Sequence, residues 1–199
     1  MIQAPTYKYI KQVIFQLFIN NEWKDAVSGK TFDTYNPHDE RVIAKVAHGD
    51  KADIYLAVNT AKQAFHRNSP WRLMDASYRG RVLLKFADLM ERDSEYLIAL
   101  ESYNNGATYT FAKLTFHMSL RALRYIASLA DKVQGATVPA DGDVFAYTLK
   151  QPVGVCGLIL PWNVPIAMFV NKVATALAAG KSSFTGPLIA PLLEKVLFM

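Results

Sequence analysis

The most informative segment of the chain reads Pro152-Val-Gly-Val-Cys-Gly-Leu-Ile-Leu-Pro-Trp-Asn-Val-Pro165. Residues 153–160 are nearly all apolar and punctuated by glycine, which is typical of a strand buried on both faces of a parallel sheet. Pro161-Trp162-Asn163 follows, and Pro165 suits the first position of a helix that ends at Gly180. In an open α/β sheet, ligands bind at the loop after a strand's carboxyl end. The segment therefore predicts a strand, a site-bearing loop and a helix.

Asn163 is the candidate functional residue of this loop. Its side-chain amide stands between two prolines that stiffen the backbone, so it can serve as a fixed hydrogen-bond donor to an oxyanion. The alternative is that Asn163 is the N-cap of the following helix, because asparagine is a favoured N-cap. The local pattern on its own favours the cap, since caps are far more common than oxyanion donors.

Upstream of this segment, the apolar pattern predicts a small β region followed by a helical layer. We expect a β-hairpin in which residues 18–23 and 31–35 are joined through the turn Ser28-Gly29, and then a third strand at 42–46. After residue 46, the spacing of the apolar residues changes from a period of two to a period of about 3.6, which is typical of a helix. Asp50 and Asp53 form a capping-box-like start to the first helix. Further helices are expected from Ser77, at 95–102 and at 109–133.

Between the helices and the site segment, the pattern becomes extended again. Asp141-Gly142-Asp143 predicts a turn, after which Phe145, Tyr147 and Leu149 alternate with more polar residues. Such a strand has one apolar face to bury against something.

The composition is that of an ordinary folded protein, with 199 residues, 51% of them hydrophobic. The net charge of +5 comes from interleaved charges and forms no basic cluster, so we expect no nucleic-acid partner. No segment is apolar enough to span a membrane, and the first eighteen residues do not resemble a secretory signal. The single cysteine, Cys156, excludes an internal disulfide. The four histidines have no metal-ligand spacing, and we expect a cytoplasmic protein without a metal site.

Blocks of sequence along the chain resemble the aldehyde dehydrogenase superfamily, most closely its cytosolic class, which includes retinal dehydrogenases, and a mitochondrial relative. Leu-Pro-Trp-Asn-Val-Pro resembles the family motif Pro-Trp-Asn-Phe-Pro, and further blocks appear in the family's order at 18–23, 35–37, 69–72, 74–77, 79–81, 87–93, 141–143 and 151–157. The resemblance implies an α/β fold. It would be a partial dinucleotide-binding (Rossmann-like) domain with an amino-terminal β-hairpin, a helical layer and an extended oligomerisation strand arm.

The resemblance also implies a division of the chain and a role for several residues. The parts would be an amino-terminal extension (1–17), the amino-terminal part of the NAD-binding domain (18–134), an oligomerisation arm (135–153), the strand–loop–helix of the NAD site (154–180) and an aberrant or truncated tail (181–199). Asn163 would donate to the oxyanion of the thiohemiacetal formed from the aldehyde. The nicotinamide half of NAD would lie against Ile159, Leu160, Pro161 and Trp162.

Two residues depart from the family pattern at positions that shape the aldehyde tunnel. Val164 replaces a phenylalanine, and Asn171 replaces a tryptophan. Lys181 resembles the family lysine that binds the adenosine ribose, although the apolar strand expected before it is missing. The interpretation favoured here is that 181–199 form an aberrant tail.

In the family, the nucleophilic cysteine and the glutamate base lie far downstream of Pro-Trp-Asn. Cys156 matches a strand residue before the asparagine, so its expected role is structural. We therefore expect an amino-terminal fragment that is inactive alone. The alternative is a non-catalytic protein that joins or modulates oligomers of full-length dehydrogenase subunits.

Overall fold

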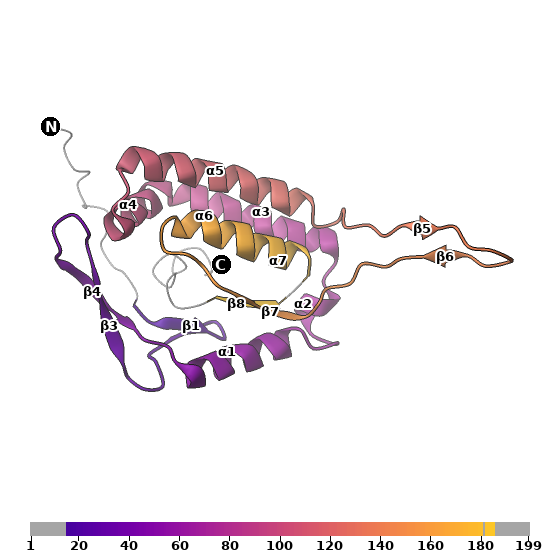
Figure 1. Ribbon diagram of the computed structural model, residues 1–199, viewed down its shortest axis with the longest axis horizontal. Helices are drawn as coiled ribbons and strands as arrows, with labels where there is room; N and C mark the ends of the chain where they lie inside the picture. The colour runs from indigo at the N-terminus through magenta and orange to yellow at the C-terminus, as the bar shows by residue number, and fades with distance from the viewer. Residues whose placement is uncertain (1–14, 181, 186–199) are drawn as a thin grey trace.

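The computed structural model describes residues 15–180 and the strand at 182–185 (Figure 1). Its amino-terminal region contains two separate antiparallel hairpins. β1 (Leu17–Ile19) pairs with β2 (Glu22–Lys24), and β3 (Thr31–Tyr35) pairs with β4 (Val42–Ala47).

The hairpin is therefore present, but its predicted pairing is wrong. Asn20 and Asn21 both adopt positive φ, 57° and 58°, which is the geometry of a two-residue hairpin turn. That turn closes the first hairpin within 17–24, so β3 pairs with the next strand along the chain. Gly29 does form a turn, in which its N–H donates to the Ala26 carbonyl at 2.8 Å, but this turn joins no paired strands.

The helical layer follows the predicted order. Its elements are α1 (Lys51–Ala64), the short α2 (Pro70–Leu73), α3 (Ala76–Arg92), α4 (Ser94–Asn105) and α5 (Tyr109–Ser128). The capping box of α1 is confirmed, because Asp50 accepts the Ala52 N–H and Asp53 accepts the Asp50 N–H, each at 3.0 Å. α5 ends at Ser128, earlier than expected, and the chain then continues in tight turns.

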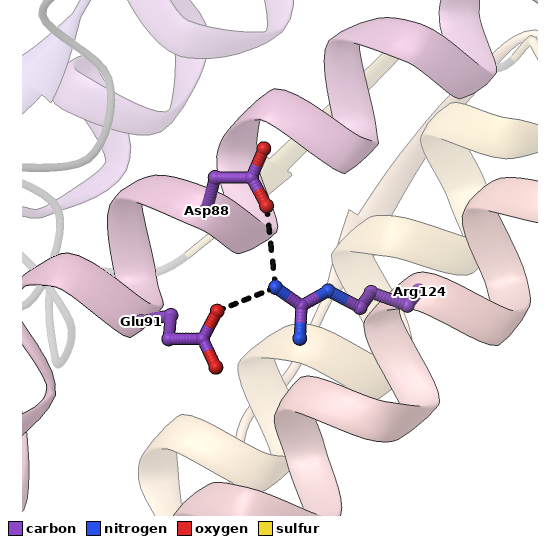
Figure 2. A network of polar contacts seen from close by, with 3 residues as sticks. All are labelled: Asp88, Glu91 and Arg124. Atoms are coloured by element: carbon purple, nitrogen blue, oxygen red, sulfur yellow. Dashed lines mark hydrogen bonds and ion pairs between the residues drawn. The ribbon is translucent and has the colours of Figure 1, made fainter.

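The main core lies between α3, α4, α5 and the helical segment after residue 164. Leu83, Ala87, Phe116 and Leu123 are almost fully buried in it. α3 and α5 approach closely at Gly80, where an added Cβ would lie 2.7 Å from the Ala127 carbonyl oxygen. At the surface, Arg124 of α5 reaches Asp88 at 3.2 Å and Glu91 at 2.6 Å on α3 (Figure 2).

The carboxyl-terminal region is a β–α–β unit. β7 (Val155–Leu158) leads through a loop into α6 (Pro165–Phe169), a π-helical turn η2 (Val170–Ala174) and α7 (Thr175–Ala178). β8 (Ser182–Thr185) then returns parallel to β7. In Figure 1 the β7–β8 pair lies between α1 and the α6–α7 helix.

One expectation for this unit was wrong. β7 is not buried on both faces: Val155, Cys156 and Leu158 are half-buried and Gly157 is exposed. The parallel strand that pairs with β7 begins after Lys181, at Ser182, and was not predicted. Within the described residues, β7 has only β8 as a neighbour, so part of its surface stays open.

The segment between α5 and β7 is a long hairpin that projects from the body (Figure 1). It contains β5 (Thr137–Val138) paired antiparallel with β6 (Ala146–Tyr147), and we call residues 135–150 the arm. The large apolar side chains of the arm are exposed: Val138 by 43%, and Val144, Phe145, Tyr147 and Leu149 by 65% to 76%. Across the described residues, no helix has the length and apolarity that crossing a membrane would need.

Candidate active-site loop

Asn163 lies in the loop that joins β7 to α6. The N-cap of α6 is Val164, whose side chain makes no capping hydrogen bond, so the expectation from local pattern that Asn163 is the cap was wrong. The reason is one of spacing: Pro165 occupies the first helical position and places the asparagine one residue too early. The Asn163 side chain is exposed, and its amide makes no hydrogen bond to any residue within 15–180.

The loop backbone, in contrast, is held by three side chains. The Asn105 amide Nδ2 donates to the Asn163 carbonyl at 3.0 Å. The Glu101 carboxylate accepts the Ile166 N–H at 3.3 Å. The Lys172 ammonium donates to the Ile159 carbonyl at the start of the loop. The backbone from which the Asn163 amide extends is therefore held at several points, which restricts where that donor can lie.

Glu101 is the most perturbed acidic group of the site. Its side chain is 2% exposed, and burial raises the pKa of its carboxyl to about 7, while the bond from the Ile166 N–H acts in the opposite direction. Sequence reasoning did not single out Glu101, Asn105 or Lys172. For Glu101 a signal was present, because an acidic residue directly follows the apolar run at 97–100.

The residues expected to hold the nicotinamide fall into two groups. Ile159 is 87% exposed and Trp162 is 74% exposed, and Pro161 beside them is exposed as well. These apolar residues follow the carboxyl end of a parallel strand, which is where ligands bind in α/β sheets. Leu160 is buried in the main core, so only its backbone faces the loop. Lys181 lies outside the described residues.

The remaining residues of interest lie around this loop. Val164 is half-buried at the start of α6, and Asn171 is exposed in the π-helical turn. Cys156 is half-buried in β7, ahead of the loop, and its sulfur lies 3.9 Å from the Gly154 carbonyl oxygen.

A parallel β–α–β unit with a loop at the strand's carboxyl end is the arrangement in which α/β proteins of the dinucleotide-binding class bind their ligands. Comparison with known proteins gives the particular family. The sequence model of the aldehyde dehydrogenase family matches residues 23–190, and the chain belongs to this family.

Among curated relatives, aldehyde dehydrogenase 1A1 of Mesocricetus auratus is 52% identical over 174 residues, which is 86% of this chain and 34% of the relative. Human mitochondrial aldehyde dehydrogenase is 55% identical over 166 residues, 83% of this chain and 32% of the relative. The chain thus spans about a third of the length of these relatives.

Solved structures agree with the fold. The NAD+ complex of aldehyde dehydrogenase from Bacillus cereus matches with a TM-score of 0.84 at 38% identity, covering 89% of this chain and 36% of that one. Apo betaine aldehyde dehydrogenase from Staphylococcus aureus matches with a TM-score of 0.88 at 30% identity. This match covers 96% of this chain and 40% of that one. The structure is accordingly a partial α/β NAD-binding domain, and NAD is the cofactor of the family.

Proposed function

We propose that this chain forms part of an NAD-dependent aldehyde dehydrogenase subunit and supplies the oxyanion donor for oxidation of an aldehyde to a carboxylic acid. The observation that carries the proposal is the free Asn163 amide on a backbone anchored by α4 and Lys172. The amide would donate a hydrogen bond to the aldehyde oxygen as that oxygen gains negative charge. One such donor contributes about 10²- to 10³-fold to kcat in acyl-transfer enzymes.

In this proposal the loop also forms one side of the cofactor site. Bound NAD would supply the hydride acceptor. Ile159, Pro161 and Trp162 would hold the nicotinamide by apolar contact, and Leu160 would contribute its backbone. Lys181 is proposed to bind the adenosine ribose.

Saturation-transfer NMR on the purified protein with NAD+ tests this cofactor surface. We expect saturation to reach the nicotinamide protons, and we expect this signal to be lost in Trp162→Ala. Phe145→Ala is the matched control, because it removes an equally exposed aromatic ring from the arm. A nicotinamide signal that never appears, or that survives Trp162→Ala unchanged, contradicts the proposal.

We further propose that the 199 residues alone do not oxidise aldehydes. Their single cysteine, Cys156, lies within β7 ahead of the loop, so it is not the attacking thiol in this proposal. The expected result is no NADH formation above background with acetaldehyde. Turnover that disappears in Cys156→Ser would overturn this point and make Cys156 the nucleophile.

A second function is favoured by the arm. Its apolar residues Val144, Phe145, Tyr147 and Leu149 are exposed, as expected of a surface that packs against another subunit. The chain would then act as a non-catalytic partner in homo-oligomers or in mixed oligomers with full-length subunits. Co-expression with a full-length relative, followed by size exclusion, should give mixed oligomers that Phe145→Ser weakens. Their absence with the unaltered chain would remove this function.

We propose that the protein is located in the cytosol. Its relatives include the rat protein named aldehyde dehydrogenase, cytosolic 1, which is 50% identical over 173 residues. Because the human mitochondrial relative is 55% identical over 166 residues, cell fractionation against mitochondrial markers is the deciding measurement.

A further inference from the structure

We propose that Glu101 and Asn105 are positioning residues that hold the Asn163 loop in place, an inference that rests on the function proposed above for Asn163. The two residues lie four apart near the end of α4, and residues at this spacing share one face of a helix. Both contact the loop backbone, and neither touches the Asn163 side chain through a hydrogen bond.

Both contacts lie on the carboxyl-terminal side of the Asn163 side chain along the backbone. Asn105 fixes the peptide plane that follows Asn163, by donating to its carbonyl at 3.0 Å. Glu101 fixes the first helical turn three residues later, by accepting the Ile166 N–H at 3.3 Å. Pro161 and Pro165 restrict φ within the same loop. With the backbone restrained in this way, the direction in which the Asn163 side chain leaves it is restrained as well.

The Asn105 amide is itself oriented by a second bond. Its Oδ1 accepts the Ala107 N–H at 2.8 Å, which leaves Nδ2 directed at the Asn163 carbonyl. Gly106 closes the helix in a left-handed conformation with φ of 77°, and Pro37 packs against it. The end of α4 is therefore a firm support for the loop.

The hydrogen-bond acceptor of Glu101 suits its position. Its carboxyl oxygen lies at the amino-terminal end of the helix that begins at Pro165, where backbone N–H groups have no acceptor within the helix. The residue is also anchored by the buried run at 96–100 on the same helix, so its side chain approaches the loop from a rigid element.

Asn104 offers a matched control. It is the neighbouring asparagine on α4, but its Nδ2 donates to the Thr34 hydroxyl of β3 at 3.2 Å, away from the loop. The experiment measures ¹⁵N backbone order parameters of the purified protein. We expect Asn105→Ala to lower the values at Asn163 and Val164 from about 0.85 toward about 0.6. Asn104→Ala should leave both values at the wild-type level.

Glu101 is tested by a conservative pair. Glu101→Gln keeps an acceptor for the Ile166 N–H and should preserve the order parameters, whereas Glu101→Leu should lower them at Val164 and Ile166. A thermal melt confirms that each variant is folded, and if Glu101→Leu does not fold, the Asn105→Ala and Asn104→Ala pair decides. Wild-type order parameters in Asn105→Ala, or an equal loss in Asn104→Ala, overturn the proposal.

This result is separable from the proposed function. If Asn105→Ala loosens the loop but no nicotinamide signal appears in the NAD+ experiment, the positioning role stands and the dehydrogenase role fails. If the nicotinamide signal appears but Asn105→Ala changes no order parameter, only the positioning role fails.

Discussion

Replacing Glu101 with glutamine is predicted to stabilise the protein at neutral pH and not at acidic pH. Glutamine has nearly the same shape and can still accept the Ile166 N–H, but it carries no charge to bury. The change therefore isolates the cost of keeping an ionised carboxyl in a site where the side chain is 2% exposed.

The pH dependence of this stabilisation follows from proton linkage. Burial raises the pKa of the Glu101 carboxyl from 4.5 to about 7 in the folded protein. Below about pH 4.5 the group is protonated in both states, and its contribution to the unfolding free energy is fully present. Between about pH 4.5 and about pH 7 the unfolded chain releases the proton first, so stability falls as pH rises. The total loss that corresponds to this pKa change is about 3 kcal/mol.

The assay is urea unfolding followed by circular dichroism at about pH 4, 6 and 8. The gain of Glu101→Gln over wild type should grow with pH and approach about 3 kcal/mol at the highest value. Glu95→Gln controls for the loss of one carboxyl, because Glu95 is exposed on the same helix. A difference between Glu101→Gln and wild type that stays constant across the three pH values refutes the reasoning.

Three further changes test the packing. Gly80→Ala should destabilise the protein by about 1–2 kcal/mol in urea unfolding, because the added Cβ would lie 2.7 Å from the Ala127 carbonyl oxygen. This strain exceeds the gain in helix propensity. A variant as stable as the wild type, or more stable, would show that α3 and α5 can separate freely. Leu123→Ala should cost about 3 kcal/mol, since the side chain is fully buried, and a cost under about 1 kcal/mol would contradict the core assignment. Arg124→Ala should lower the free energy of unfolding by less than about 1 kcal/mol, because both ion pairs of Arg124 are exposed. The loss should shrink in high salt. A large loss that does not depend on salt would be inconsistent with a surface network.

The long helices were predictable because their apolar stripes repeat over many turns. Phe116, Leu120 and Leu123 mark the buried face of α5 in the sequence, and all three are buried in the structure. The hairpin pairing was not predictable from the turn signals used. Ser28-Gly29 is the stronger turn signal by composition, but the two asparagines before it take the left-handed conformations that close a hairpin.

For the site, the sequence indicates the loop but not its supports. Asn163 is recognisable because the segment around it has a distinctive pattern. Asn105 and Glu101 are separated from their loop partners by 58 and 65 positions, so their roles arise only when α4 packs against the loop. β8 was missed for a related reason: its residues are largely polar, and only pairing with β7 defines the strand.

The π-helical turn at 170–174 has a bearing on how this chain tolerates insertions and deletions. A π turn holds one residue more than the α-helical turn it replaces. Loss of a single codon here would return the turn to regular α-helix, and the two halves of the helix would keep nearly the same rotation because only the extra residue is lost. Phe169 would stay against Phe86, and the Ile166 N–H would stay on Glu101. The gene should therefore tolerate a one-codon deletion better at this point than in the flanking α-helical turns, where a lost residue rotates one half of the helix by about 100°.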